Sequence, residues 1–257
     1  MEKHVFYFLF LMFSILNSQE KVLDSLINLD EVSVTGSRAS DDMPITFSNV
    51  SKKDLSKRNL GQDLPILLNF LPSVVTTSDA GAGIGYTGIR VRGSDATRVN
   101  VTINGIPYND PESQGTFWVN LPDISSSVEN IQVQRGVGTS TNGSSAFGAT
   151  INILTDGISQ EGYTKISRSY GSFNSQKSTV KYSTGLINNK FEFSGRHSKI
   201  KSDGYIDRAS SNLKSYFFQG LYKNDKRLFK LLVFGGSEIT YQSWYGVDPF
   251  TLKNDRT

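Results

Sequence analysis

The sequence offers few of the side chains that carry catalysis or bind metals. It has no cysteine and only two histidines, His4 and His197. Acid–base catalysis and metal centres draw heavily on histidine and cysteine, and the lack of cysteine excludes a disulfide framework. The neighbouring carboxylates Asp41 and Asp42 are typical of a solvated linker. We therefore expect no enzymatic activity and no metal or cofactor site.

Two glycine-rich segments invite comparison with phosphate-binding loops. Residues 78–87 carry glycines at 81, 83 and 85, and residues 136–140 carry two more. A phosphate-binding loop continues into a Lys-Ser/Thr pair and a helix, and neither segment has that pair. A strand-like run follows the first segment. Both segments are therefore expected to be flexible loops.

Length and charge narrow the function classes further. The chain of 257 residues is long enough for one large or two small domains. Its net charge is +3, and no compact basic run with interleaved aromatic residues is present. Such a run is typical of nucleic-acid binding. A nucleic-acid partner is therefore not expected.

Residues 88–155 carry an unusual number of charged side chains for a small sheet. Four short alternating or β-branched runs, separated by Gly, Asn, Asp and Ser, predict the sheet. The Asn-Gly pair at 104–105 predicts a tight turn, because both residues tolerate positive φ. The charged residues in or beside the runs are Arg90, Arg92, Arg98, Glu129 and Arg135. They form either a solvated face of a free-standing domain or a face docked inside a polar container.

Residues 1–18 have the pattern of a secretory signal peptide. Lys3 and His4 precede an apolar run over residues 5–16, and Ser18 is a small residue suited to cleavage. A membrane-spanning helix needs about 20 apolar residues, so this run is too short for an anchor. A buried N-terminal helix is the alternative, but the run has no polar face. Export is therefore expected.

Two segments before the sheet have recognisable local patterns. Val32 and Val34 alternate with polar residues in a short extended segment, which is either a plain strand or an edge offered to another protein. Residues 48–72 are expected to be helical. Ser51 begins a capping-box-like start for a helix over 52–59. Pro65 suits the first turn of a second helix, whose leucines face the core.

A long loop over residues 108–121 gathers aromatic and amide side chains. Such side chains on a loop suit ligand contact. Packing that pins the loop in place is an equal alternative. The candidate ligand contacts, counting one tyrosine from the glycine-rich segment 78–87, are Tyr86, Tyr108, Gln114, Phe117 and Trp118.

Five runs of about ten residues follow position 162. They cover residues 163–170, 177–184, 190–198, 214–222 and 227–234. Strands of roughly 9–11 residues with one apolar face suit the wall of a membrane β-barrel. An open sheet would leave unpaired backbone groups in lipid, so we expect a barrel whose remaining strands are missing. The alternative is a soluble all-β sandwich.

Several motifs, taken together, resemble those of the TonB-dependent outer-membrane receptors. They are Ile-Arg-Val-Arg-Gly at 89–93, Asn-Gly-Ile-Pro at 104–107, Val-Glu-Asn-Ile-Gln-Val-Gln-Arg-Gly at 128–136 and Phe-Gly-Ala-Thr-Ile-Asn-Ile at 147–153. Their order and spacing are similar to the plug pattern of that family. Residues 31–38, Glu-Val-Ser-Val-Thr-Gly-Ser-Arg, resemble the TonB box and the start of the plug. Asn104 departs from the pattern, because many members carry Asp there.

The resemblance implies a chain of four parts in the outer membrane. These are a signal peptide over 1–18, an N-terminal extension with the TonB box over 19–38, an α+β plug domain over 39–157, and the start of a transmembrane antiparallel β-barrel over 158–257. The barrel of the family has 22 strands, and about five are expected here.

Energised import is the mechanism that the resemblance implies. A small-molecule ligand binds outside, and the TonB box then pairs as an added strand with TonB, which works with the energising complex of the inner membrane. The expected TonB-binding residues are Glu31, Val32, Ser33, Val34 and Thr35. The barrel lumen is the polar container for the plug, so contacts with the barrel wall are expected from Arg90, Arg92, Glu129 and Arg135.

Several ligand classes fit the sequence equally. A siderophore, metal chelate or cobalamin-like ligand is the main expectation. Import of an oligosaccharide by the same architecture is one alternative. A passive surface-binding β-barrel is another, and it would need neither a plug nor residues 31–35.

Overall fold

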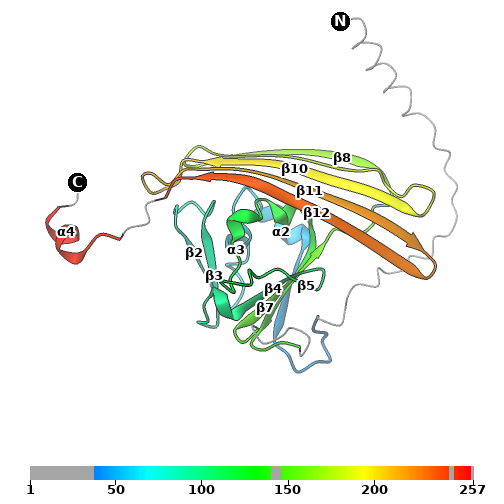
Figure 1. Cartoon of the computed structure of the whole chain (residues 1–257), viewed down its shortest axis with the longest axis horizontal. Helices are drawn as coiled ribbons and strands as arrows, with labels where there is room; N and C mark the ends of the chain where they lie inside the picture. The colour runs from blue at the N-terminus through cyan, green and yellow to red at the C-terminus, as the bar shows by residue number, and fades with distance from the viewer. Residues whose placement is uncertain (1–37, 140–145, 243–245, 256–257) are drawn as a thin grey trace, which may run out of the picture. The chain divides into compact units, whose positions relative to one another are not determined.

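The computed structural model describes residues 38–139, 146–242 and 246–255. The expected signal peptide and the TonB-binding residues 31–35 lie outside this part of the chain. Within it, no helix is long and apolar enough to cross a membrane. The described residues form an N-terminal module, residues 38–157, and a C-terminal sheet, residues 163–240 (Figure 1).

The N-terminal module contains short strands, short helices and single 3-10 turns. Its strands are β1 (Phe47–Ser51), β2 (Val74–Ser78), β3 (Thr87–Val91), β4 (Val99–Ile103), β5 (Ile106–Pro107), β6 (Val128–Arg135) and β7 (Ala149–Thr155). Its helices are α2 (Lys52–Arg58) and α3 (Leu64–Leu67), and its 3-10 turns are η3 (Ala96–Arg98), η4 (Trp118–Asn120) and η5 (Ile124–Ser127).

Five of these strands form the main sheet of the module. Their order is β1-β6-β7-β4-β5, in which β4 and β7 run parallel and the other neighbours run antiparallel. The four predicted runs over residues 88–155 are all strands, but β3 pairs with β2 in a separate two-stranded sheet. Asn104 (φ 50°) and Gly105 (φ 81°) both have positive φ in the tight turn between β4 and β5. The predicted turn is confirmed.

The helical prediction over residues 48–72 is partly wrong. Residues 47–51 are strand β1, because they pair with β6, a partner about 80 residues further along the chain. Helix α2 then begins where the capping pattern predicts, and Ser51 Oγ accepts a hydrogen bond from the backbone N–H of Asp54 at 3.2 Å. Pro65 lies in the first turn of α3, as predicted.

Valine, isoleucine and leucine side chains from the helices and the main sheet form one core. Leu55 and Leu68 pack with Ile131 and Ile151, and each is at most 1% exposed. Full burial of such a side chain contributes about 1.5–3 kcal/mol. Phe217 of the C-terminal sheet belongs to the same cluster. Apolar packing therefore continues from one part of the chain into the other.

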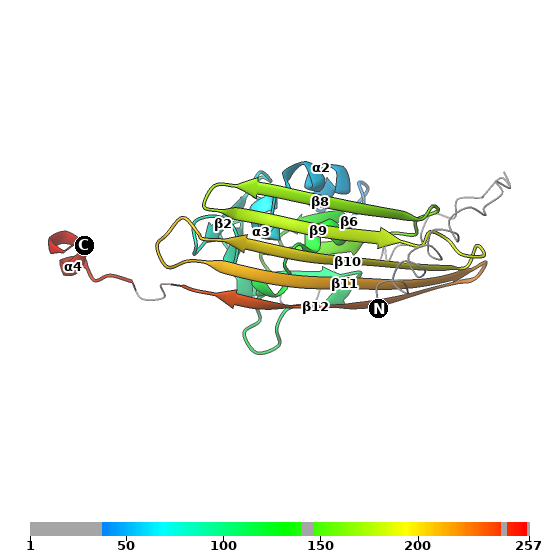
Figure 2. The same ribbon diagram turned by 90° about the horizontal axis from the view of Figure 1, so that it is seen from above.

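The C-terminal sheet is a meander of five long strands. They are β8 (Tyr163–Gly171), β9 (Ser175–Ser183), β10 (Phe191–Ser202), β11 (Ser211–Asn224) and β12 (Arg227–Thr240), and the short helix α4 (Pro249–Asn254) follows. Each strand pairs antiparallel with the next, and Figure 2 shows them side by side. The five predicted runs are confirmed as strands. Among the described residues the sheet does not close into a barrel.

The two faces of the C-terminal sheet differ in chemistry. Side chains alternate between faces along a strand. One face is buried and mainly polar toward the N-terminal module, with Lys177, Thr179 and Arg196 as examples. The opposite face is exposed and apolar, with Phe193 and Leu231 as examples. The inner face therefore positions the functional site described next.

Candidate functional site

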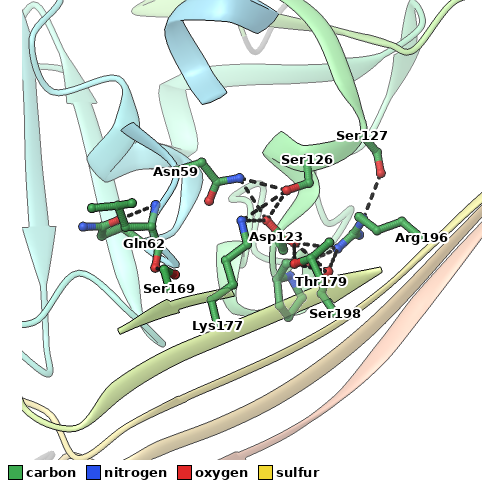
Figure 3. A network of polar contacts seen from close by, with 12 residues as sticks. Asn59, Gln62, Asp123, Ser126, Ser127, Ser169, Lys177, Thr179, Arg196 and Ser198 are labelled. Atoms are coloured by element: carbon green, nitrogen blue, oxygen red, sulfur yellow. Dashed lines mark hydrogen bonds and ion pairs between the residues drawn. The ribbon is translucent and has the colours of Figure 1, made fainter. Parts of the chain in front are cut away.

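A buried network of charged groups joins the N-terminal module to the C-terminal sheet. The acids come from the module and the bases from strands β9 and β10. We call this network the ionic interface; its charged members are Asp123, Asp156, Lys177, Lys181 and Arg196. Figure 3 shows its centre around Asp123.

Asp123 is the hub of the ionic interface. Its backbone is left-handed, with φ 55°, immediately before η5, and aspartate tolerates this region better than most residues. Its carboxylate is fully buried and lies 2.6 Å from Lys177 Nζ and 3.4 Å from Arg196 Nη1. The hydroxyl and amide donors to the same carboxylate are Asn59, Ser126, Thr179 and Ser198, at 2.6–3.0 Å.

Arg196 extends the network to the backbone of the module. Its Nε donates to Ser127 Oγ at 2.8 Å, and its Nη1 donates to the carbonyl of Pro122 at 3.3 Å. Ser215 of β11 donates to the same carbonyl at 2.7 Å. Asp123 and the residues around it are therefore bonded to three neighbouring strands, β9, β10 and β11.

A second acid, Asp156, lies at the end of the module. It pairs with Lys181 of β9 and with Lys52 Nζ of α2, the latter at 2.6 Å. Gln219 of β11 donates to the Asp156 carbonyl at 2.9 Å. Gln219 also accepts from Thr155 Oγ1 at 3.1 Å, and Asn104 holds Thr155 through two further hydrogen bonds. Asn104 Nδ2 donates to Thr155 Oγ1 at 3.0 Å, which a carboxylate could not do.

Both carboxylates are held in the ionised form. Burial alone would raise the pKa of Asp123, but Lys177 and Arg196 with the hydrogen bonds keep that pKa below its ordinary value. Burial opposes ionisation of Asp156 as well, and Lys181 and Lys52 again hold its pKa low. A buried pair adds little net stability, while loss of one partner costs several kcal/mol. The ionic interface therefore holds the N-terminal module in one defined position against strands β9 and β10.

The four residues predicted to contact the barrel wall have partners within the module or are exposed. Glu129 pairs with Lys52 Nζ at 3.0 Å, and Arg135 donates to the Pro72 carbonyl at 3.1 Å, both within the module. Arg90 and Arg92 are exposed. Their contact with a barrel wall stays a prediction. We expected the module to contribute mainly positive charges to the contacts. In the described contacts the module contributes aspartates, and the strands contribute the lysines and the arginine.

The ionic interface was missed at the sequence level, although one signal for it was present. Lys177, Thr179 and Lys181 alternate with Val180 and Tyr182 along β9. A lysine-bearing face opposite an apolar face indicates a polar surface that must be paired once buried. Its acidic partners could not be found in this way, because Asp123 and Asp156 lie in irregular segments.

The candidate ligand contacts lie in different surroundings. Gln114 and Phe117 are exposed, Tyr86 and Tyr108 are half-buried, and Trp118 is 3% exposed within the core. Trp118 therefore pins its loop by packing, the alternative considered above. Val119, next to it, packs with Ile84 and Tyr86 against β10 and β11. The structure thus brings the loops 78–87 and 108–121 together beside β10 and β11.

The glycine-rich segment also contacts a loop of the C-terminal sheet. The Ala80 carbonyl accepts a hydrogen bond from the backbone N–H of Tyr205 at 2.8 Å. Tyr205 lies between β10 and β11, and a side chain at Gly81 would meet its ring at 3.0 Å. The end of the sheet that carries residues 203–210 therefore lies beside residues 80–86.

A partly open cavity of about 840 Å³ lies along the ionic interface. Helix α2, η5 and strands β8 and β9 line it. Its charged lining is mostly basic: Lys52, Lys53, Lys165, Lys177 and Lys181, with the single carboxylate Glu129. The cavity has the size of a small-molecule site, and three of its five lysines, Lys52, Lys177 and Lys181, are already paired with Asp123 or Asp156.

Asp63 is a buried carboxyl of a different kind, because it has no ion pair among the described residues. It precedes α3, and its backbone N–H donates to Gly83 in the glycine-rich segment at 2.9 Å. Thr87 Oγ1 donates to its carboxyl at 3.0 Å. Burial dominates over these hydrogen bonds and raises the pKa of Asp63 to about 8.

The raised pKa of Asp63 predicts a pH-dependent stability. The folded state keeps the proton up to about pH 8, while the unfolded chain releases it near pH 4. The stabilisation is complete below pH 4 and is lost as the pH rises toward 8. We expect the free energy of unfolding to fall by about 2 kcal/mol between pH 6 and 8, and the fall to be absent in Asp63→Asn. Equal slopes in the two proteins would contradict this assignment.

Comparison with known proteins identifies the N-terminal module. Residues 39–150 match the family model of the TonB-dependent receptor plug domain. The vitamin B12 transporter BtuB of Vibrio cholerae serotype O1 is 29% identical over 154 residues, which are 59% of this chain and 24% of BtuB. The chain therefore spans about a quarter of the length of the curated relatives that it matches.

Solved structures with a similar fold include three receptors and transporters. The siderophore receptor PirA from Acinetobacter baumannii has a TM-score of 0.58 at 18% identity, over 75% of this chain and 32% of PirA. The copper transporter OprC has 0.63 at 16%, over 76% and 32%. The ferripyoverdine receptor of the outer membrane of Pseudomonas aeruginosa has 0.62 at 12%, over 78% and 27%. The chain therefore carries the plug domain of the TonB-dependent receptors, followed by strands with the fold of their barrels.

Proposed function

We propose that the protein is an outer-membrane receptor that imports a scarce nutrient with energy transmitted from the inner membrane. The observation that carries this proposal is the ionic interface. It holds a plug domain against the inner face of the strands through Asp123 and Asp156. A passive surface-binding barrel would need no plug, and it would need no such fastening.

TonB is the proposed partner, bound at residues 31–35 as an added strand. The first described residues after this segment are firmly bonded to the main sheet. The Ala39 N–H donates to Gln132 Oε1 at 2.7 Å, and Gln132 Nε2 donates back to the Ala39 carbonyl at 2.9 Å. Arg38 also donates to Asn130. A pull on residues 31–35 therefore reaches β6 directly.

The proposed ligand is a siderophore, metal chelate or cobalamin-like molecule that carries acidic groups. The named relatives transport vitamin B12, siderophores or copper. Lys53 and Lys165, the two lysines of the cavity that have no ion pair among the described residues, would suit carboxylate or phosphate groups better than a neutral oligosaccharide. Entry from outside would use the exposed candidates Gln114 and Phe117 and the half-buried Tyr86. Export through the signal peptide 1–18 would place the protein in the outer membrane.

The proposal is tested by uptake in cells with and without the full-length receptor gene. The panel comprises labelled ferric siderophores, cobalamin, a copper chelate and a neutral oligosaccharide. We expect receptor-dependent accumulation of one acidic ligand, which stops when a protonophore collapses the proton gradient while surface binding persists. Uptake that survives collapse would indicate a passive barrel. Accumulation of the oligosaccharide alone would support that alternative substrate class.

A further inference from the structure

The exposed face of the C-terminal sheet has a one-sided charge distribution. Near the end where β10 meets β11, the charged residues on this face are all basic: Arg168, Lys199, Lys201 and Lys214. The one other charged residue of β8–β12 on this face is Arg227, at the other end of the sheet, beside the turn between β11 and β12. No aspartate or glutamate of these strands lies on this face.

Strand register places three of these residues in one line across the sheet. Arg168 pairs with Ser178, Ser178 pairs with Lys199, and Lys199 pairs with Lys214. Arg168 Nε donates to Ser178 Oγ at 3.3 Å, which confirms that both point to this face. Neighbouring strands lie about 4.8 Å apart, so the line is about 14 Å long. We call Arg168, Lys199 and Lys214 the basic row.

The basic row lies at the border of the apolar band. The neighbouring rows carry Val180 and Tyr216, then Tyr182 and Phe218, and the band continues to Tyr222. Eight residues separate Tyr222 from Lys214, about 27 Å along the strand. With a strand tilt of about 40° this is about 21 Å across the membrane, close to the roughly 25 Å height of such bands. The basic row therefore lies at the level of lipid headgroups.

The arrangement of the row calls for an anion. Lys199 and Lys214 are directly opposite each other on adjacent strands, and like charges in such a pair repel. Within strands β8–β12, no carboxylate on this face offsets the repulsion. A phosphate can accept from an arginine fork and from two ammonium groups at once. The end of the sheet with the row is also the end where residues 203–210 contact the plug loop 80–86.

We propose that the basic row binds the phosphate groups of an anionic lipid in the outer leaflet of the outer membrane. The proposal rests on the proposed function only in taking the sheet as a membrane wall. It does not depend on which nutrient is imported. The lipid is outside the barrel, so the row would anchor the wall at a fixed depth and would leave the ligand path untouched.

The test uses the full-length receptor in neutral detergent and native mass spectrometry. The probe is lipid A with two phosphate groups, compared with its dephosphorylated form. We expect the phosphorylated lipid to bind at least tenfold more tightly to the wild type. The double variant Lys199→Gln, Lys214→Gln should lose this preference. Arg227→Gln, on the same face but at the opposite turn, is the matched control and should keep it.

Two outcomes would overturn the proposal. One is equal binding of both lipids to the wild type, and the other is an unchanged preference in the double variant. Millimolar inorganic phosphate should fail to displace the lipid, because the acyl chains contribute by lying on the apolar band. Complete displacement would mean a site for free phosphate instead. Heat-dependent gel migration and ligand uptake, expected to equal those of the wild type, verify that the variants fold.

Discussion

Replacing Asp123 with asparagine is expected to destabilise the folded receptor by about 3–5 kcal/mol and to loosen the plug from the strands. Asparagine keeps the shape and one carbonyl acceptor, but it removes the charge that Lys177 and Arg196 share. Both cations would then be buried without a counter-ion, which is the costly way to break a buried pair. The expected results are a lower free energy of unfolding and greater permeability to a large antibiotic.

The matched control for this prediction is Glu129→Gln. It breaks the ion pair with Lys52. The side chains of Lys52 and Glu129 are 46% and 47% exposed, and such exposed pairs contribute at most about 1 kcal/mol. Removing one of the stranded cations with Lys177→Met should restore part of the stability of Asp123→Asn. Equal effects of Asp123→Asn and Glu129→Gln would show that the ionic interface does not fasten the plug.

The pH dependence of this fastening should differ from that of Asp63. Because the pKa of Asp123 is below its ordinary value, its contribution is present at all pH values above about 4. It is lost only as the pH falls further, through the pKa of the folded state. In Asp63→Asn, where the other titration is removed, the free energy of unfolding should therefore stay nearly constant from pH 8 to 5.

A proline at position 34 is expected to abolish uptake while leaving ligand binding at the cell surface intact. Val34 lies in the segment proposed to pair with TonB, and a paired strand relies on its backbone N–H groups. Proline has no N–H and fixes φ, so it removes one hydrogen bond and disturbs its neighbours. The measurements are uptake of labelled ligand, binding of the same ligand at the cell surface, and capture of the receptor by the periplasmic part of TonB.

Asn28→Pro provides the control for Val34→Pro, because residue 28 precedes the proposed pairing segment. It should import normally and bind TonB as the wild type does. Normal uptake by Val34→Pro would remove residues 31–35 as the TonB-binding segment. Loss of surface binding in the same variant would point instead to a failure of export.

Local patterns predicted those parts of the fold whose cause is local. The Ser51 cap, the Asn-Gly turn and the long alternating strands are each set by neighbouring residues, and each is confirmed. Strand β1 was predicted as helix because its partner β6 lies about 80 residues away. The separation of β2 and β3 from the main sheet was missed for the same reason. Register between distant strands has no signature in a short window.

The site shows the same contrast between features with a local cause and features that depend on distant residues. The sequence predicted docking of the plug against a polar surface, and the residues chosen for the contacts were three arginines and Glu129, which are visible in or beside strands. The residues that make the described contacts are Asp123, in a left-handed turn, and lysines that a strand pattern treats as solvent-facing. Only the tertiary fold shows that Lys177 is 5% exposed.

The attachment of Arg38 and Ala39 to the main sheet has a mechanical consequence. Strand β1 is the edge strand, with Phe47 opposite Gln134 and Ser51 opposite Asn130. A tensile load entering at residue 38 first acts on the hydrogen bonds of Arg38 to Asn130 and of Ala39 to Gln132, and it then reaches β1 at Phe47. Under a load directed across the sheet, the backbone pairs of β1 and β6 open one at a time from Phe47 instead of shearing together. The force needed to begin release is therefore set by a few hydrogen bonds at one edge, and a thermodynamically stable plug is compatible with a weak pull.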